Sequence, residues 1–291
     1  MTPFRYLRTA TAAATLVLLG ACAQPGTGAG SSPSSAPAAA PPTDGDALVL
    51  RVKQTGGFAG PEMIASRIPD LSVYADGRLI FDGPVTQQYP GPALPNVLVR
   101  TISPEQVRQL TEQATAAGVR DGTDYGQPGV ADASTTEVTV TTSAGTQTVA
   151  ANALREAMAE DPQLTTAQQE ARAKLRTFLD GTDKLLAGSG AQPYLPETLA
   201  VVVRPYVQPG DDLPRPQPVA WPGPALPGEA LAAPQKLSCV SATGDQRDAV
   251  FAAAKAANSA TPWSSGGNNW AVTFRPLLPG ESGCADLKAA R

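Results

Sequence analysis

The side chains that could do chemistry in this chain are carboxylates, hydroxyls, lysines and three cysteines, because its 291 residues include no histidine. That absence excludes the Ser-His-Asp triad, its Cys-His relatives, and zinc sites built on imidazole. Histidine is also the usual general base near neutral pH. An enzyme with this sequence would need paired carboxylates, a Ser-Lys pair or a bound cofactor, and no motif in the chain indicates a cofactor.

Three groups of acidic residues are candidates for such chemistry. Asp121, Asp124 and Asp132 share a loop with glycine and proline, which is the kind of loop that supplies oxygen ligands to calcium. Their spacing does not match an EF-hand and no distal glutamate follows, so we expect a solvated turn and no metal site. The pairs Glu160-Asp161 and Asp211-Asp212 could act as paired carboxylates in a hydrolase. Neither pair has an aromatic residue nearby on which a sugar ring could stack, so we expect both pairs on the solvated surface.

Trp263 and Trp270 are the best candidate binding residues. They flank the polar, glycine-rich segment 264–269, and two indoles beside such a loop could stack on a sugar ring or on a partner's side chain. The alternative, which the sequence favours, is a structural loop whose tryptophans pack on a disulfide.

Cys22 ends a Leu-Gly-Ala-Cys run that resembles the lipobox of bacterial lipoproteins. Arg5 and Arg8 form a basic start, and the apolar run 10–19 that follows is too short to span a bilayer of about 30 Å. The resemblance implies that residues 1–21 are a cleaved signal peptide and that Cys22 carries a diacylglycerol as the new N-terminus. Two or more acyl chains would hold the protein on the outer face of the membrane. The alternative is an ordinary secretory signal with an incidental cysteine.

Residues 22–45 predict a disordered tether, because alanine, proline, serine, glycine and threonine dominate and leave little apolar surface to bury. Loss of residues 1–21 removes Arg5 and Arg8 and no acid, so the net charge falls from −4 to −6. This balance does not suit nucleic acid or anionic headgroups, which attract clusters of lysine and arginine.

Cys239 and Cys284 remain as an even pair. In an exported protein such a pair predicts a disulfide. A redox pair is the alternative, but the chain has no Cys-x-x-Cys spacing to support it.

The hydrophobic pattern predicts an α+β fold, with a mostly antiparallel sheet and packed helices. Asp76-Gly77 predicts a two-residue turn within a hairpin over 71–81, and capping boxes at Ser103 and Thr243 predict two helix starts. The other predicted strands are 47–52, 96–102, 135–142, 147–151, 199–203, 236–241 and 270–275, and the other helices are 153–160 and 166–179.

We divide the mature chain after the tether into three parts. Residues 46–206 form the α+β domain, 207–235 form a proline-rich strap, and 236–291 form a disulfide-stapled strand-helix-strand unit packed on the main domain. The segment 209–234 contains eight prolines. Its apolar side chains Trp221, Leu226 and Leu231 could pack on the surface of the domain, which favours an extended strap over a free linker.

Three segments are similar to a group of uncharacterised actinobacterial lipoproteins: the hairpin 72–80, the helix start 102–106, and the ending 274–281 followed by Cys284. The resemblance covers most of residues 46–284. It implies no assigned activity, cofactor or catalytic residue.

The function we expect is that of a non-catalytic, lipid-anchored cell-envelope protein that binds an extracytoplasmic partner or ligand. Its contacts would be the membrane, through Cys22, and a protein, cell-wall or lipid partner, with no nucleic acid. A carrier of a lipid or other hydrophobic ligand is the first alternative, and would need an apolar cavity above about 300 Å³. A carboxylate-dependent hydrolase is the second, and would need two carboxylates about 5 to 10 Å apart in a cleft.

Overall fold

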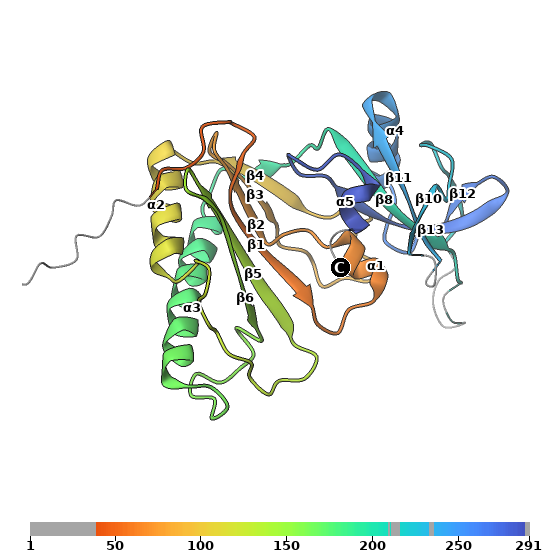
Figure 1. The fold of residues 1–291 in the computed structure, drawn as a ribbon. Helices are drawn as coiled ribbons and strands as arrows, with labels where there is room; N and C mark the ends of the chain where they lie inside the picture. Colours follow the sequence, from red (N-terminus) through yellow and green to blue (C-terminus); the bar gives the residue numbers. More distant parts are fainter. Residues whose placement is uncertain (1–38, 209, 211–215, 233–235, 289–291) are drawn as a thin grey trace, which may run out of the picture. The chain divides into compact units, whose positions relative to one another are not determined.

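The computed structural model describes residues 39–208, 210, 216–232 and 236–288. The predicted signal peptide 1–21, the lipidation candidate Cys22 and the pair Asp211-Asp212 lie outside the described residues. The α+β prediction is confirmed: the described part contains five helices and two mostly antiparallel sheets (Figure 1). None of the helices in these ranges is long and apolar enough to cross a membrane.

The first sheet has seven antiparallel strands in the order β6-β5-β1-β2-β3-β4-β7. The strands are β1 (Leu48–Gly56), β2 (Leu71–Tyr74), β3 (Arg78–Asp82), β4 (Val97–Thr101), β5 (Ser134–Thr142), β6 (Gly145–Asn152) and β7 (Gln192–Pro193).

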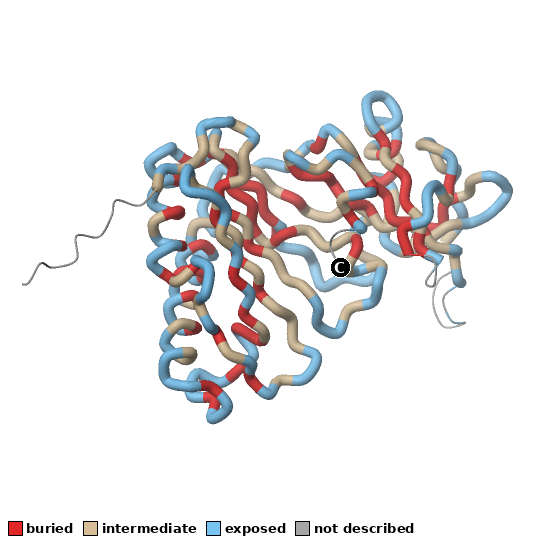
Figure 2. The backbone as a smooth tube through the Cα atoms, viewed as in Figure 1, coloured by how far each residue is buried: buried red, intermediate tan, exposed pale blue. Residues whose placement is uncertain are grey.

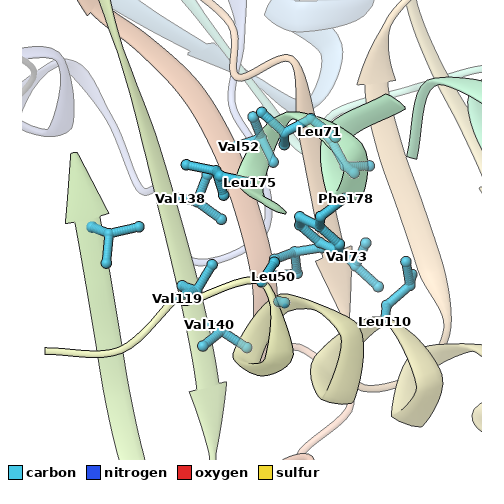
Figure 3. Packing of buried hydrophobic residues seen from close by; sticks show 14 of the residues in the cluster. Leu50, Val52, Leu71, Val73, Leu110, Val119, Val138, Val140, Leu175 and Phe178 are labelled. Atoms are coloured by element: carbon cyan, nitrogen blue, oxygen red, sulfur yellow. The ribbon is translucent and has the colours of Figure 1, made fainter. Parts of the chain in front are cut away.

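Two helices, α2 (Pro104–Ala116) and α3 (Thr166–Leu186), cover one face of this sheet (Figure 1). Each helix begins with a capping box, in which the hydroxyls of Ser103 and Thr165 accept from the backbone three residues on. Apolar side chains of the helices and strands fill the space between them. In Figure 3, Leu50 and Val73 of the sheet gather with Phe178 of α3 and Leu110 of α2. Full burial of each such side chain stabilises the fold by about 1.5 to 3 kcal/mol.

The hairpin between β2 and β3 differs from the predicted one by one residue. Val73 pairs with Leu79, so the connection is a three-residue loop that ends at Gly77, whose φ is 87°. Glycine is needed there because a Cβ would lie 2.3 Å from the carbonyl oxygen of Ile102. This register places Asp70 opposite Asp82 just beyond the paired strands, where the Asp82 N–H donates to the Asp70 carbonyl at 3.4 Å.

The second sheet has six strands in the order β10-β11-β8-β13-β12-β9, antiparallel except for the β12–β9 pair. The strands are β8 (Thr198–Pro205), β9 (Val219–Ala220), β10 (Glu229–Ala232), β11 (Leu237–Thr243), β12 (Trp263–Ser265) and β13 (Asn268–Pro276). In β8, residues 199–203 are all buried, as the unbroken apolar run predicts. Figure 2 shows buried segments running along the strands of both sheets.

Different elements cover the two faces of the second sheet. Helices α1 (Pro61–Ser66) and α5 (Cys284–Lys288) pack on one face, where Cys239 and Cys284 form the predicted disulfide. Helix α4 (Gly244–Lys255) and residues of the proline-rich segment pack on the other. Glu62 holds α1 in place, with its carboxylate 2.6 Å from both Arg204 and Thr273.

The segment that follows β13 lies on the face of the first sheet away from α2 and α3. Leu278 packs with Tyr74, Ile80 and Val97, and the Tyr194 hydroxyl donates to the carbonyl of Leu277 at 2.9 Å. Both sides of the first sheet are therefore covered in its β2-β3-β4 region.

The expected boundary at residue 206 does not separate the two sheets. Strand β8 lies before this boundary, yet its neighbours β11 and β13 both lie after it. The described part of the proline-rich segment supplies β9 and β10 at the two edges of the same sheet. The second sheet therefore draws on all three parts that the sequence suggested.

Besides the hairpin turn, three local predictions are wrong. No helix covers 153–160, where Ala153 has a φ of 47° and the Leu154 carbonyl accepts from Arg176 of α3. The Thr243 side chain makes no capping hydrogen bond to α4. The tether ends earlier than residue 45, since the carbonyls of Ala40 and Gly45 accept hydrogen bonds from the folded part.

Candidate functional site

The described part of the chain contains a solvent-open cleft of about 960 Å³. Segments from both sheets line it: residues 66–68 and Met63 from the α1 region, the loop residues 84–86 and 91–96, residues 272–274 of β13, and Gln54, Asp70, Asp82, Ser134 and Ser259. Its volume lies in the range of small-ligand sites.

The loop after β3 forms one wall and is held at both ends. At its base the Gly83 N–H donates to the Asn96 carbonyl, and the Asn96 amide donates to the Pro84 carbonyl, both at 2.7 Å. Farther along, the Ser259 N–H donates to the Gly91 carbonyl at 2.9 Å. Gly83 itself leaves no room for a side chain, because a Cβ would lie 2.7 Å from the Asn96 amide nitrogen. This wall is therefore a fixed part of the fold.

Large apolar side chains are exposed in the cleft lining and in the wall loop. Met63 and Val85 line the cleft and are 58% and 65% exposed, and Tyr89, farther along the same loop, is 66% exposed. Apolar side chains exposed together beside a hollow are typical of surfaces that bind a ligand or a partner.

The cleft also contains the acid pair Asp70 and Asp82. Burial raises the pKa of Asp70, although a hydrogen bond from the Gln54 amide at 2.8 Å and the charge of Arg67 oppose the shift. The Asp82 side chain opens into the cleft, where loss of surrounding water raises its pKa and the charge of Asp70 raises it further. The pair can accept hydrogen bonds from a cationic or N–H-bearing group, or hold a proton at a higher pH than isolated carboxylates can.

The two tryptophans do not contribute to this cleft. Trp263 is only 1% exposed and packs edge-on against Trp221 and Phe274, with ring centroids 5.4 and 6.0 Å away. Trp270, its cross-strand partner, is half-buried and donates from its indole N–H to the Ser265 carbonyl at 3.3 Å. Trp263 therefore leaves no ring surface for a ligand.

The expectation that the tryptophans pack on the disulfide is also wrong. They belong to the cluster on the α4 side of the second sheet, whereas Cys239 and Cys284 lie in the cluster on the α1 and α5 side. Side chains alternate between the faces of a strand, and this alternation separates the two groups.

The acidic candidates from the sequence that the structure describes do not line this cleft. Asp124 accepts from the Gln168 amide and from the Gly126 N–H, both at 2.8 Å, and these bonds lower its pKa. Asp161 is buried, not solvated as expected, and caps the turn by accepting from the Gln163 N–H. Within the described ranges no three or more cysteine, aspartate or glutamate side chains are placed to hold a metal ion.

Sequence reasoning missed Asp70 and Asp82 because they are twelve positions apart and match no motif. The one available signal was the hairpin between them, whose exact register decides whether they meet. Comparison of the chain with protein-family models, with curated proteins and with solved structures finds no match.

Proposed function

We propose that this chain is a lipid-anchored cell-envelope protein that binds an extracytoplasmic ligand or partner in the cleft and catalyses no reaction. The observation that carries the proposal is the open cleft of about 960 Å³, which combines exposed apolar side chains with an acid pair. The anchor would be a diacylglycerol on Cys22, outside the described residues, and the protein would face away from the cytoplasm.

The chemistry of the lining suggests what the cleft would take. Met63 and Val85 offer apolar contact, while Asp70 and Asp82 offer acceptors for N–H groups. A ligand with an apolar body and an amine, amide or guanidinium group would satisfy both. Such a ligand could be a small molecule or a segment of a protein or cell-wall polymer.

Native mass spectrometry of the full chain, released from detergent micelles, tests this proposal. We expect a bound mass that is lost on denaturation and that Ser259→Trp removes, because an indole at Ser259 would occupy part of the cleft. Ser143→Trp is the matched control, since Ser143 is an exposed turn serine outside the cleft lining and should keep the bound mass. A ligand that Ser259→Trp retains would contradict the proposed site.

A macromolecular partner requires a second measurement. A photo-cross-linking amino acid at Val85 should capture a partner on intact cells, and the same group at Ser143 should not. If the chain carries no bound mass and Val85 gives no site-specific cross-link, the cleft is not a binding site.

The anchor has a separate test. Cys22→Ala should leave the chain unprocessed at the lipobox and without label from a palmitate analogue. Continued labelling of this variant would remove Cys22 from the proposal and leave the cleft unaffected.

Two alternatives each have one observation in their favour. The volume of the cleft favours a carrier of a lipid or other hydrophobic ligand, although polar residues share the lining. If the mass released in native mass spectrometry is a lipid, the result would favour the carrier. The acid pair in the cleft favours a carboxylate-dependent hydrolase, and substrate turnover that stops in Asp82→Asn would decide for that.

A further inference from the structure

A second pocket, of about 290 Å³, shares Gln54, Arg67 and Ile68 with the cleft but faces different residues. Its volume is on the order of ten water molecules, enough for a small anionic group. Its lining draws cationic side chains from three places in the chain: Arg51 and Lys53 of β1, Arg67 after α1, and Arg275 of β13.

The charge of this pocket is opposite to that of the whole chain. The chain has 22 lysines and arginines against 26 aspartates and glutamates. The pocket lining has four cationic side chains against two carboxylates, those of Glu281 and Asp286. Lys53 pairs at 2.8 Å with Glu137, which is outside the lining, so the local surplus is one to two positive charges.

Both carboxylates of the lining are already engaged. Glu281 accepts from the Arg275 guanidinium at 2.9 Å and from the Leu278 N–H at 2.7 Å. Asp286 accepts from the N–H groups of Ser282 and Gly283, and these bonds lower its pKa. Glu281 is thus paired with Arg275, while Asp286 keeps its negative charge, and the surplus of one to two positive charges already includes both carboxylates.

In the part of the chain that the structure describes, Arg51 and Arg67 donate hydrogen bonds to neutral groups, and the charge of Arg67 also acts on Asp70. Arg51 donates from Nε to the Ser72 hydroxyl at 3.3 Å, and Arg67 donates from Nη1 to two backbone carbonyls at 3.1 and 3.2 Å. Neither forms an ion pair with a carboxylate of those residues. A guanidinium carries five N–H donors, so each side chain keeps donors for a ligand.

Buried Arg275 lies close enough to Arg51 for the two positive charges to repel one another. This side chain is 3% exposed, and burial lowers its pKa. The charge of Glu281 opposes the shift, while the positive charge of Arg51 adds to it. An anion bound between them would relieve this repulsion.

We propose that this pocket binds a phosphoryl group, either free phosphate or a phosphate ester. Arginine suits this role because its planar fork donates two parallel hydrogen bonds to phosphate oxygens. A phosphate ester carries one to two negative charges near neutral pH, which matches the local surplus. The pocket shares Gln54, Arg67 and Ile68 with the proposed ligand cleft, but Arg51 and Lys53 line the pocket alone. Variants of these two residues therefore test the phosphoryl proposal without changing the lining of the cleft.

The test titrates the full chain, purified in a non-ionic detergent, with inorganic phosphate at constant ionic strength, followed by calorimetry. We expect saturable binding that Arg51→Gln weakens at least tenfold. Arg108→Gln is the matched control, because Arg108 is exposed on α2 and pairs with Glu105 and Glu112. Lys53→Gln is a second pocket variant in case Arg51→Gln perturbs folding, and it should also weaken binding.

Three results would overturn the proposal: no saturable binding by the unmodified chain, an equal loss in Arg108→Gln, or unchanged binding in both pocket variants. The source of the phosphoryl group follows from a comparison of ligands. Tighter binding of glycerol phosphate than of inorganic phosphate would indicate a lipid headgroup or a wall polymer. The reverse order would indicate free phosphate.

Discussion

Gly77 should be one of the most sensitive positions in the first sheet, and Gly77→Ala tests why. Its φ of 87° costs an L-residue about 1 kcal/mol. In addition, the new Cβ would lie 2.3 Å from the Ile102 carbonyl oxygen, so the backbone would have to move. Overpacking of this kind costs typically about 1 to 3 kcal/mol. We therefore expect Gly77→Ala to lower the free energy of unfolding by about 2 to 4 kcal/mol.

Gly190 provides a matched control. Its φ of 89° is almost the same, but no atom lies within 4 Å of the position that a Cβ would take. Gly190→Ala should therefore cost only the conformational part, about 1 kcal/mol. Urea unfolding of both variants, followed by far-UV circular dichroism, measures the difference. Equal losses in the two variants would refute the reasoning, because the contact with Ile102 would then contribute nothing.

Two further predictions concern the disulfide and the acid pair. The cysteines of the Cys239–Cys284 bridge are 45 positions apart, so replacing both by alanine should lower the free energy of unfolding by about 4 kcal/mol. Thermal unfolding would show this loss as a lower midpoint temperature. A loss below about 1 kcal/mol would contradict the prediction. The pKa of Asp82 is raised in the folded state, so its contribution to stability is present below the unfolded pKa of about 3.9 and is lost as the pH rises through the folded value. Asp82→Asn should therefore reduce the loss of stability between about pH 4 and pH 7 in urea titrations, and an unchanged pH profile would show that Asp82 is not perturbed.

Local signals in the sequence predicted most of the elements because their causes are local. Ser103, Pro104 and Gln106 define the start of α2 by themselves, and the apolar run 199–203 can only be a buried segment. The partnership of β8 was not predictable in this way. Its neighbours are decided by packing between segments that are far apart in the chain, and no local pattern records that choice.

The acid pair shows how much can depend on one residue of register. A two-residue turn at Asp76-Gly77 would have paired Ala75 with Arg78 and placed Asp70 opposite Gly83. Asp82 would then have pointed to the other face of the sheet, since a shift of one residue turns every side chain over. The observed three-residue loop brings Asp70 and Asp82 together instead. Asp-Gly is compatible with both loops, so this sequence alone could not decide between them.

The position of β8 in the second sheet also affects the order in which the protein can form as it is made. All seven strands of the first sheet and both of its helices precede residue 194, so that sheet can be completed early. Strand β8 comes next, but its neighbours β11 and β13 are synthesised later, after the proline-rich segment. Until β11 and β13 have been synthesised, both edges of the apolar run 199–203 in β8 are left without a partner strand. A chain that stops before β13 would therefore keep a template for aggregation, which makes late truncations more harmful than the loss of one strand would suggest.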